Sequence, residues 1–167
     1  MEVDIRQATE EDIDALYAIY DVLGKKDGGY FEICFEKECL ILIASADNKD
    51  IAFGVLNFEP KYNLYQKLDI PEIQDLNVIP YARQQGVATQ MVTAFENIAR
   101  DQGYDQIGIS VGLTKDYGAA QRLYMKLGYM PDGYGVTYDR EGVTVGASYP
   151  VDDDFALMMV KNLDACT

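Results

Sequence analysis

Hydrophobic and polar positions change their spacing along this chain, and each change predicts a new helix or strand. The apolar residues Val87, Met91, Phe95 and Ile98 recur at helical spacing, which predicts an amphipathic helix over residues 86–102. Short apolar runs bounded by Gly, Pro, Asn or Asp predict strands. The chain therefore reads as an alternating series of both elements.

The same reading locates the other elements. Helices are predicted over residues 10–22, 30–38 and 117–127, the first with Thr9 as its N-cap. Strands are predicted over residues 3–7, 40–46, 51–59, 72–78, 106–111, 129–138 and 155–162. The remaining segments are a polar hairpin turn at 47–50, a loop at 60–71 and an irregular excursion before the last strand. This order indicates an α/β or α+β fold.

Composition favours one cytoplasmic domain over residues 1–167. The hydrophobic fraction is 49%, and no linker, repeat or low-complexity run marks a boundary. The acidic N-terminus does not resemble a signal peptide, and the apolar runs are too short to cross a membrane. Cys34, Cys39 and Cys166 lack metal-ligand spacing and are interpreted as reduced thiols.

The absence of histidine excludes much chemistry. Ser-His-Asp and Cys-His nucleophile systems, histidine zinc sites and imidazole bases are all unavailable to this chain. We expect no metal. Any proton must move through a carboxylate, tyrosine, lysine, cysteine or water.

The net charge of −14 bears on possible partners. Such a field repels nucleic acid and anionic membranes and attracts cations, so neither nucleic acid nor membrane is an expected partner. The acidity could serve solubility alone, or part of it could line a cleft for an amine. The sequence leaves open whether the protein is a monomer or a homodimer.

Residues 76–88, LNVIPYARQQGVA, place a strand and a glycine-containing loop directly before the long amphipathic helix. The first turn of a helix has unpaired N–H groups and the positive end of the helix dipole. Residues 84–89 could therefore hold a phosphate largely through backbone groups. A plain structural turn is the alternative interpretation.

A second segment, residues 117–129, reads YGAAQRLYMKLGY. Together the two segments resemble the signatures of the GCN5-related N-acetyltransferase (GNAT) superfamily. The matching residues are Arg83, Gly86 and Ala88 in the first signature and Ala120, Leu123, Tyr124, Gly128 and Tyr129 in the second. Tyr117 stands where the second signature has asparagine. The resemblance extends from about residue 3 to the last strand.

This resemblance implies a fold and a co-substrate. The implied fold is a mixed, mostly antiparallel central sheet that splays between strands four and five, with helices on both faces. The implied co-substrate is acetyl-CoA, with its pantetheine arm along strand four and its pyrophosphate on the loop that follows. The expected coenzyme-binding residues are Asn77, Val78, Ile79, Arg83, Gln84, Gln85, Gly86, Val87, Ala88, Thr89, Tyr117, Ala120 and Tyr124.

Transfer of an acetyl group to an amine needs a base for the amine and a proton donor for the departing thiolate. Glu72 and Asp75 on strand four are the candidate bases, and a water chain without a single base is a further option. The resemblance implies that Tyr124 protonates the coenzyme sulfur. A core tyrosine with a satisfied hydroxyl is the alternative for Tyr124.

The acceptor site is expected to combine aromatic and acidic side chains, namely those of Tyr30, Phe31, Glu32, Tyr138 and Asp153. Such groups suit a small cationic amine such as an aminoglycoside or polyamine. A peptide or protein amine is the second interpretation. A non-catalytic acetyl-CoA-binding regulatory module is the third. A dinucleotide-binding Rossmann fold is disfavoured, because the sequence has no Gly-x-Gly-x-x-Gly motif.

Overall fold

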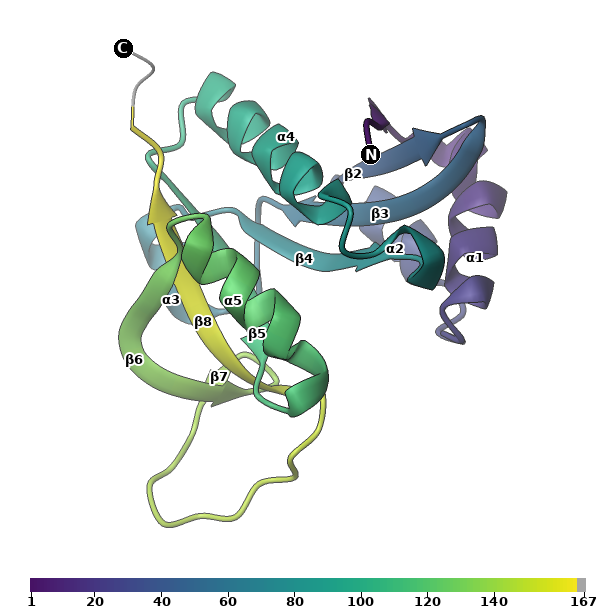
Figure 1. The fold of residues 1–167 in the computed structure, drawn as a ribbon. Coiled ribbons are helices and arrows are strands. Elements are labelled where there is room, and N and C mark those ends of the chain that lie inside the picture. Colours follow the sequence, from purple (N-terminus) through teal and green to yellow (C-terminus); the bar gives the residue numbers. More distant parts are fainter. Residues whose placement is uncertain (165–167) are drawn as a thin grey trace. The chain divides into compact units, whose positions relative to one another are not determined.

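Helices and strands follow one another in nearly the predicted order (Figure 1). The computed structural model describes residues 1–164. The strands are β1 (Asp4–Gln7), β2 (Leu40–Ala46), β3 (Lys49–Asn57), β4 (Glu72–Val78), β5 (Gln106–Gly112), β6 (Met130–Tyr138), β7 (Glu141–Gly142) and β8 (Phe155–Asn162). The helices are α1 (Ile13–Val22), α2 (Tyr30–Glu36), α3 (Asn63–Leu68), α4 (Val87–Asp101) and α5 (Gly118–Lys126). Short 3₁₀ turns occupy Glu10–Asp12, Pro80–Ala82 and Lys115–Tyr117.

The chain divides into two compact units. The first unit comprises Met1–Asn57 and Ile73–Asn97, and the second comprises Phe58–Glu72 and the chain from Ile98 onward. The expected splay between strands four and five concerns how these units are arranged, and it stays a prediction. Cys34 and Cys39 are free buried thiols of the first unit, whereas Cys166 lies outside the described residues.

In the first unit the strand order is β1-β2-β3-β4. β2 runs antiparallel to both β1 and β3. The turn between β2 and β3 is tighter than predicted, because Lys49 already pairs with Ala46. Asp47 and Asn48 form this turn in the left-handed region, with φ of 50° and 61°. Asp and Asn tolerate that conformation, which suits the twist of a hairpin.

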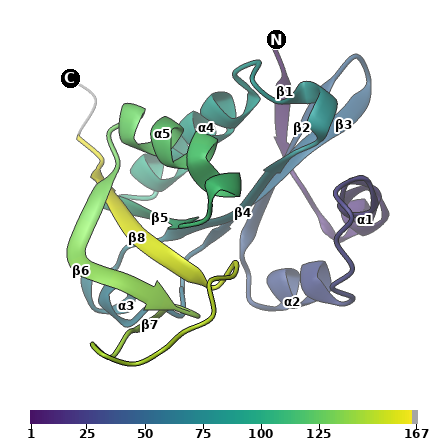
Figure 2. The ribbon, with the colours of Figure 1, turned by 60° about the horizontal axis from the view of Figure 1, so that its bottom comes forward.

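Helices cover both faces of the sheet in the first unit (Figure 2). On one face, the ring of Phe53 in β3 lies 5.6 Å from Tyr20 of α1 and 5.2 Å from Phe31 of α2. On the other face, a Cβ at Gly54 would lie 2.8 Å from the ring of Phe95 in α4. A glycine at this position therefore lets α4 approach the sheet closely. These three helices build the core of the unit around β3.

In the second unit the strand order is β5-β8-β6-β7. β8 pairs antiparallel with β5 and with β6, and the β6 pairing is irregular between Pro131 and Val136. β6 and β7 form a hairpin around Asp139 and Arg140, which have φ of 48° and 62°. β7 lies in the predicted irregular excursion. A two-residue strand is too short to be seen as an alternating pattern.

The prediction of a plain loop over residues 60–71 is wrong, because this segment contains α3. Helix α3 has six residues and stands between two prolines, so its sequence is too short to show a helical period. Its buried Tyr65 holds it in place. The Tyr65 hydroxyl donates to the Met159 carbonyl at 2.5 Å, and a Cβ at Gly108 would lie 2.4 Å from the Tyr65 ring.

Candidate active site

The loop after β4 is held by a hydrogen bond from one of its own side chains to the backbone at the end of the strand. Nε of Arg83 donates to the carbonyl oxygen of Val78 at 2.8 Å, which folds the loop back onto the end of the strand. Gln84 and Gly86 adopt left-handed backbone conformations, with φ of 57° and 83°. Nothing lies within 4 Å of a Cβ built on Gly86, so its conformation rather than crowding favours glycine.

Helix α4 begins at the end of this loop. The carbonyl of Gly86 accepts the N–H of Gln90 at 3.1 Å, the first bond of the helix. The N–H groups of Val87, Ala88 and Thr89 precede this bond and so have no partner within the helix. Open space at Gly86 and free donors beside it are what an anionic coenzyme requires.

The N-terminal residue also reaches this loop, a contact that the sequence did not reveal. The amino group of Met1 donates to the carbonyl of Gln85 at 3.1 Å, and the Gln90 side chain donates to the carbonyl of Met1 at 2.7 Å. The chain start therefore supports the exposed loop. No local signal predicts a contact across more than eighty residues.

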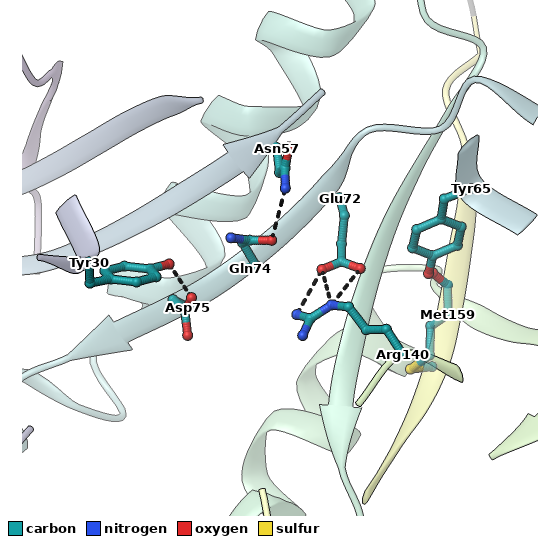
Figure 3. A network of polar contacts seen from close by, with 8 residues as sticks. All are labelled: Tyr30, Asn57, Tyr65, Glu72, Gln74, Asp75, Arg140 and Met159. Carbon is teal, nitrogen blue, oxygen red and sulfur yellow. Dashed lines mark hydrogen bonds and ion pairs between the residues drawn. The ribbon is translucent and has the colours of Figure 1, made fainter. Parts of the chain in front are cut away.

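Asp75 of β4 is held by a tyrosine from α2. The Tyr30 hydroxyl donates to Oδ2 of Asp75, and both residues belong to the first unit (Figure 3). The Asp75 side chain is exposed. A predicted base and a predicted acceptor-binding residue are thus brought together.

Glu72 has a different environment. Its side chain is fully buried and lies in an ion pair with Arg140, with 2.9 Å between Oε2 and Nη2 (Figure 3). Nε of Arg140 also donates to both carboxylate oxygens, at 3.0 and 3.3 Å. The pair joins the start of β4 to the β6–β7 turn. A buried carboxylate whose two oxygens both accept hydrogen bonds from an arginine is poorly placed to take a proton from a substrate.

Tyr124 on α5 is buried, with 7% of its surface exposed. Burial raises the pKa of its hydroxyl to about 12, so the phenol is protonated at neutral pH. Its ring lies 6.3 Å from that of Tyr129. This environment suits either a proton donor or the core tyrosine of the alternative interpretation.

Tyr117 and Asp153 are also brought together, since the Tyr117 hydroxyl donates to Oδ1 of Asp153 at 2.7 Å. The Tyr117 ring packs on Gly112, where a Cβ would lie 2.4 Å away. The tyrosine that replaces the motif asparagine therefore has a structural role. Ala120 lies two positions into α5 and is partly buried.

The remaining predicted acceptor residues divide into three cases. The Tyr138 hydroxyl donates to Asp152 at 2.9 Å, and its ring lies 5.6 Å from Tyr149. Glu32 is exposed and accepts the Tyr17 hydroxyl at 2.5 Å. Phe31 was expected to contact the acceptor, but it is fully buried among aromatic rings. Phe31 therefore packs in the core of the first unit, and its contact with the acceptor stays a prediction.

The predicted site residues fall into both units. In the first unit, Asp75, Asn77, Val78 and Ile79 lie on or directly after β4, and the loop from Arg83 leads into α4. The second unit contains Glu72, Tyr117, Ala120, Tyr124, Tyr138 and Asp153. Among residues 1–164, no cluster of three or more Cys, Asp or Glu side chains is arranged to hold a metal ion. No helix in this range is long and apolar enough to span a membrane.

The sequence matches the model of the acetyltransferase (GNAT) family over residues 5–129, more than half of the chain. The chain belongs to the GNAT family. The resemblance in its two motifs and the predicted mixed α/β fold are thereby confirmed. As a GNAT acetyltransferase it uses acetyl-CoA as acetyl donor.

Relatives of this GNAT protein differ in their acceptors. The aminoalkylphosphonate N-acetyltransferase of Salmonella typhimurium is 27% identical over 139 residues, which cover 80% of this chain and 89% of the relative. Among solved structures, the ribosomal-protein-S18-alanine N-acetyltransferase of Escherichia coli has a TM-score of 0.73 and 17% identity, with 99% and 97% of the two chains covered. A GNAT acetyltransferase of Elizabethkingia anophelis, solved with acetyl-CoA bound, has a TM-score of 0.68 and 15% identity, with 96% and 98% covered.

Proposed function

We propose that this enzyme transfers the acetyl group of acetyl-CoA directly to the primary amine of a small cationic acceptor, such as a polyamine or aminoglycoside. The observation that carries the proposal is Asp75, an exposed carboxylate on β4 held by the Tyr30 hydroxyl. A carboxylate beside aromatic rings suits an ammonium group. Both units together form one acetyltransferase domain in this proposal, which the family match across both of them supports.

The loop from Arg83 to Gly86 and the first residues of α4, up to Thr89, would hold the phosphates of the coenzyme. Its support is the backbone geometry, in which the N–H groups of Val87, Ala88 and Thr89 lack helical partners. The main chain of Asn77 and Val78 would pair with the pantetheine arm. Ile79 would only flank it, because its N–H already donates to the Ile51 carbonyl and its carbonyl accepts the N–H of Ala82. Bound acetyl-CoA supplies the thioester carbon that the acceptor nitrogen attacks.

Asp75 is the better of the two candidate bases. Its side chain is exposed, whereas Glu72 is buried and bound on both oxygens by Arg140. A base must reach the proton that it removes, directly or through one water. In this proposal Asp75 takes the proton of the acceptor ammonium, and Glu72 holds the β6–β7 turn.

Tyr124 would return a proton to the thiolate that leaves. Burial raises its pKa to about 12, so the phenol carries its proton at neutral pH, as an ordinary tyrosine also does. Donation to a thiolate needs this protonated form. The alternative, a purely structural Tyr124, predicts normal turnover without the hydroxyl.

Two other classes of acceptor are alternatives to the small cationic amine. The name of the Salmonella relative favours an amine that carries a phosphonate, and that of the Escherichia relative favours an N-terminal alanine. A binding module without catalysis is the remaining alternative.

Free thiols at Cys34 and Cys39 support a cytoplasmic setting. The protein acts as a monomer or homodimer in this account.

The test is coenzyme thiol release from acetyl-CoA with purified protein. The acceptor panel contains spermidine, an aminoglycoside, aminoethylphosphonate, amino acids and a peptide with N-terminal alanine. We expect acceptor-dependent release with spermidine or the aminoglycoside, confirmed by the mass of the acetylated product. Release with the peptide alone contradicts the small-amine proposal. Acetyl-CoA binding without release on any acceptor supports the binding module.

A further inference from the structure

Asp75 departs from the regular geometry of its strand. Its φ of 52° lies in the left-handed region, which a residue other than glycine rarely adopts inside a strand. The carbonyl of Asp75 accepts the side-chain amide of Asn77 at 2.9 Å. The Asn77 side chain therefore supports a backbone conformation at Asp75 that is unusual for a strand residue.

The carboxylate itself is fixed by Tyr30, whose hydroxyl donates to Oδ2. Burial and the nearby Asp75 charge both raise the pKa of Tyr30, so its hydroxyl keeps its proton and acts as a donor. Among residues 1–164, the described hydrogen bonds to this carboxylate reach Oδ2, and none reaches Oδ1. Oδ1 therefore belongs to an exposed side chain with one acceptor atom available.

Two aromatic rings pack against the ring of Tyr30. Its ring stacks on Tyr20 at 5.7 Å with an interplanar angle of 13°, and Phe31 meets its edge at 5.2 Å. Tyr30 also begins α2, directly after Gly29 in the left-handed region at φ of 81°. The Tyr30 hydroxyl therefore belongs to a side chain that packs against other rings at the start of a helix.

We propose that Tyr30 is the positioning residue of the acceptor site, holding Oδ2 of Asp75 so that Oδ1 receives the ammonium group of the acceptor. This inference rests on the proposed function and adds to it the residue that determines amine affinity. Tyr30 does not touch the reacting atoms. It acts through Asp75, so its effect disappears when Asp75 can no longer carry a charge.

The test is a double-mutant cycle with Tyr30→Phe and Asp75→Asn. Phenylalanine keeps the ring packing and removes only the hydroxyl. Tyr104→Phe is the matched control, because the Tyr104 ring stacks on Phe58 in the second unit and has no part in the proposed site. Steady-state kinetics use spermidine, or the panel amine that is acetylated fastest. Calorimetry measures the dissociation constant of the same amine in the presence of coenzyme A, which also serves variants with low turnover.

We expect Tyr30→Phe to raise the KM and the dissociation constant of the amine about tenfold, with kcat and acetyl-CoA affinity changed less than about threefold. In the Asp75→Asn background the same substitution should have an effect of less than about twofold, because coupled residues do not act additively. Tyr104→Phe should match the wild type.

Three results overturn the inference alone. The first is an unchanged amine affinity in Tyr30→Phe, and the second is a pair of effects that multiply in the double variant. A fall in acetyl-CoA affinity equal to the fall in amine affinity also overturns it, since that pattern indicates a general structural defect. Absence of turnover by the wild type with every amine overturns the proposed function and this inference with it.

Discussion

Arg140 reaches from the β6–β7 turn to bind Glu72 at the start of β4, with 2.9 Å between Nη2 and Oε2. Arg140 itself sits in the left-handed region at φ of 62°. The neighbouring Asp139 forms a second ion pair, at 2.8 Å to Lys61. The turn is thus anchored twice within the second unit, once through a buried carboxylate and once through an exposed one.

The two anchors should differ strongly in stability. Arg140→Met leaves the carboxylate of Glu72 buried without its partner, and we expect the free energy of unfolding to fall by about 3 kcal/mol. Lys61→Met breaks an ion pair whose side chains are 53% and 57% exposed, and we expect the free energy of unfolding to fall by less than about 1 kcal/mol. Urea denaturation measures both. Equal losses would show that the buried pair has no special role.

The roles of the two carboxylates on β4 can be separated by amide substitution. We expect Glu72→Gln to keep kcat within about tenfold of the wild type, because an amide still fills the site beside Arg140. Asp75→Asn should lower kcat by about a hundredfold, the usual size of a lost general base. Steady-state kinetics with acetyl-CoA and the fastest acceptor decide the matter. The reverse ranking would restore Glu72 as the base.

Tyr124→Phe should lower kcat by about a hundredfold while acetyl-CoA affinity stays unchanged, if its hydroxyl is the proton donor. A variant with wild-type turnover would leave Tyr124 with a structural role only. The measurement is a comparison of kcat with the coenzyme dissociation constant.

The same tyrosine predicts a pH effect on stability. The pKa of the Tyr124 hydroxyl is about 12 in the folded protein and about 10 in the unfolded chain. Its contribution to the free energy of unfolding is therefore complete below pH 10 and is lost as pH rises through 12. The wild type should therefore lose up to about 3 kcal/mol more than Tyr124→Phe over this range. Denaturant titrations at several alkaline pH values test this. Parallel pH curves for the two proteins would contradict it.

Gly86 and Gly103 form a matched pair for testing the coenzyme loop. Both have left-handed backbones, with φ of 83° and 88°, and neither has any atom within 4 Å of a built Cβ. Alanine at either position should cost about 1 kcal/mol of stability. We expect only Gly86→Ala to weaken acetyl-CoA binding as well, by about tenfold in calorimetry, because its Cβ would enter the space proposed for the phosphates. Equal affinities in both variants would remove this loop from the coenzyme site.

The sequence predicts those parts of the fold that have a long period or a distinctive turn. Helix α4 is found because its apolar face repeats over fifteen residues, and the hairpin of β2 and β3 because polar residues separate two apolar runs. Helix α3 is missed because six residues cannot show a period. Its position depends on Tyr65 packing against Gly108, a contact between distant parts of the chain.

In the site too, the sequence predicts what lies in consecutive residues and misses contacts between residues that are far apart in the chain. The motifs locate the loop at Arg83 and Gly86, because its chemistry lies in consecutive residues. They do not reveal that Arg140 binds Glu72, since 68 positions separate the two residues. The sequence also selects Tyr30 and Asp75 separately, but their pairing depends on how α2 packs beside β4.

The central claim is direct transfer from acetyl-CoA to an amine, and two-substrate initial-rate kinetics test it most directly. Rates are measured over a grid of acetyl-CoA and acceptor concentrations with the fastest acceptor of the panel. Our account predicts double-reciprocal lines that intersect, and an intact mass of the protein that is unchanged after incubation with acetyl-CoA alone. Parallel lines together with an acetylated protein would show a covalent intermediate and contradict the account.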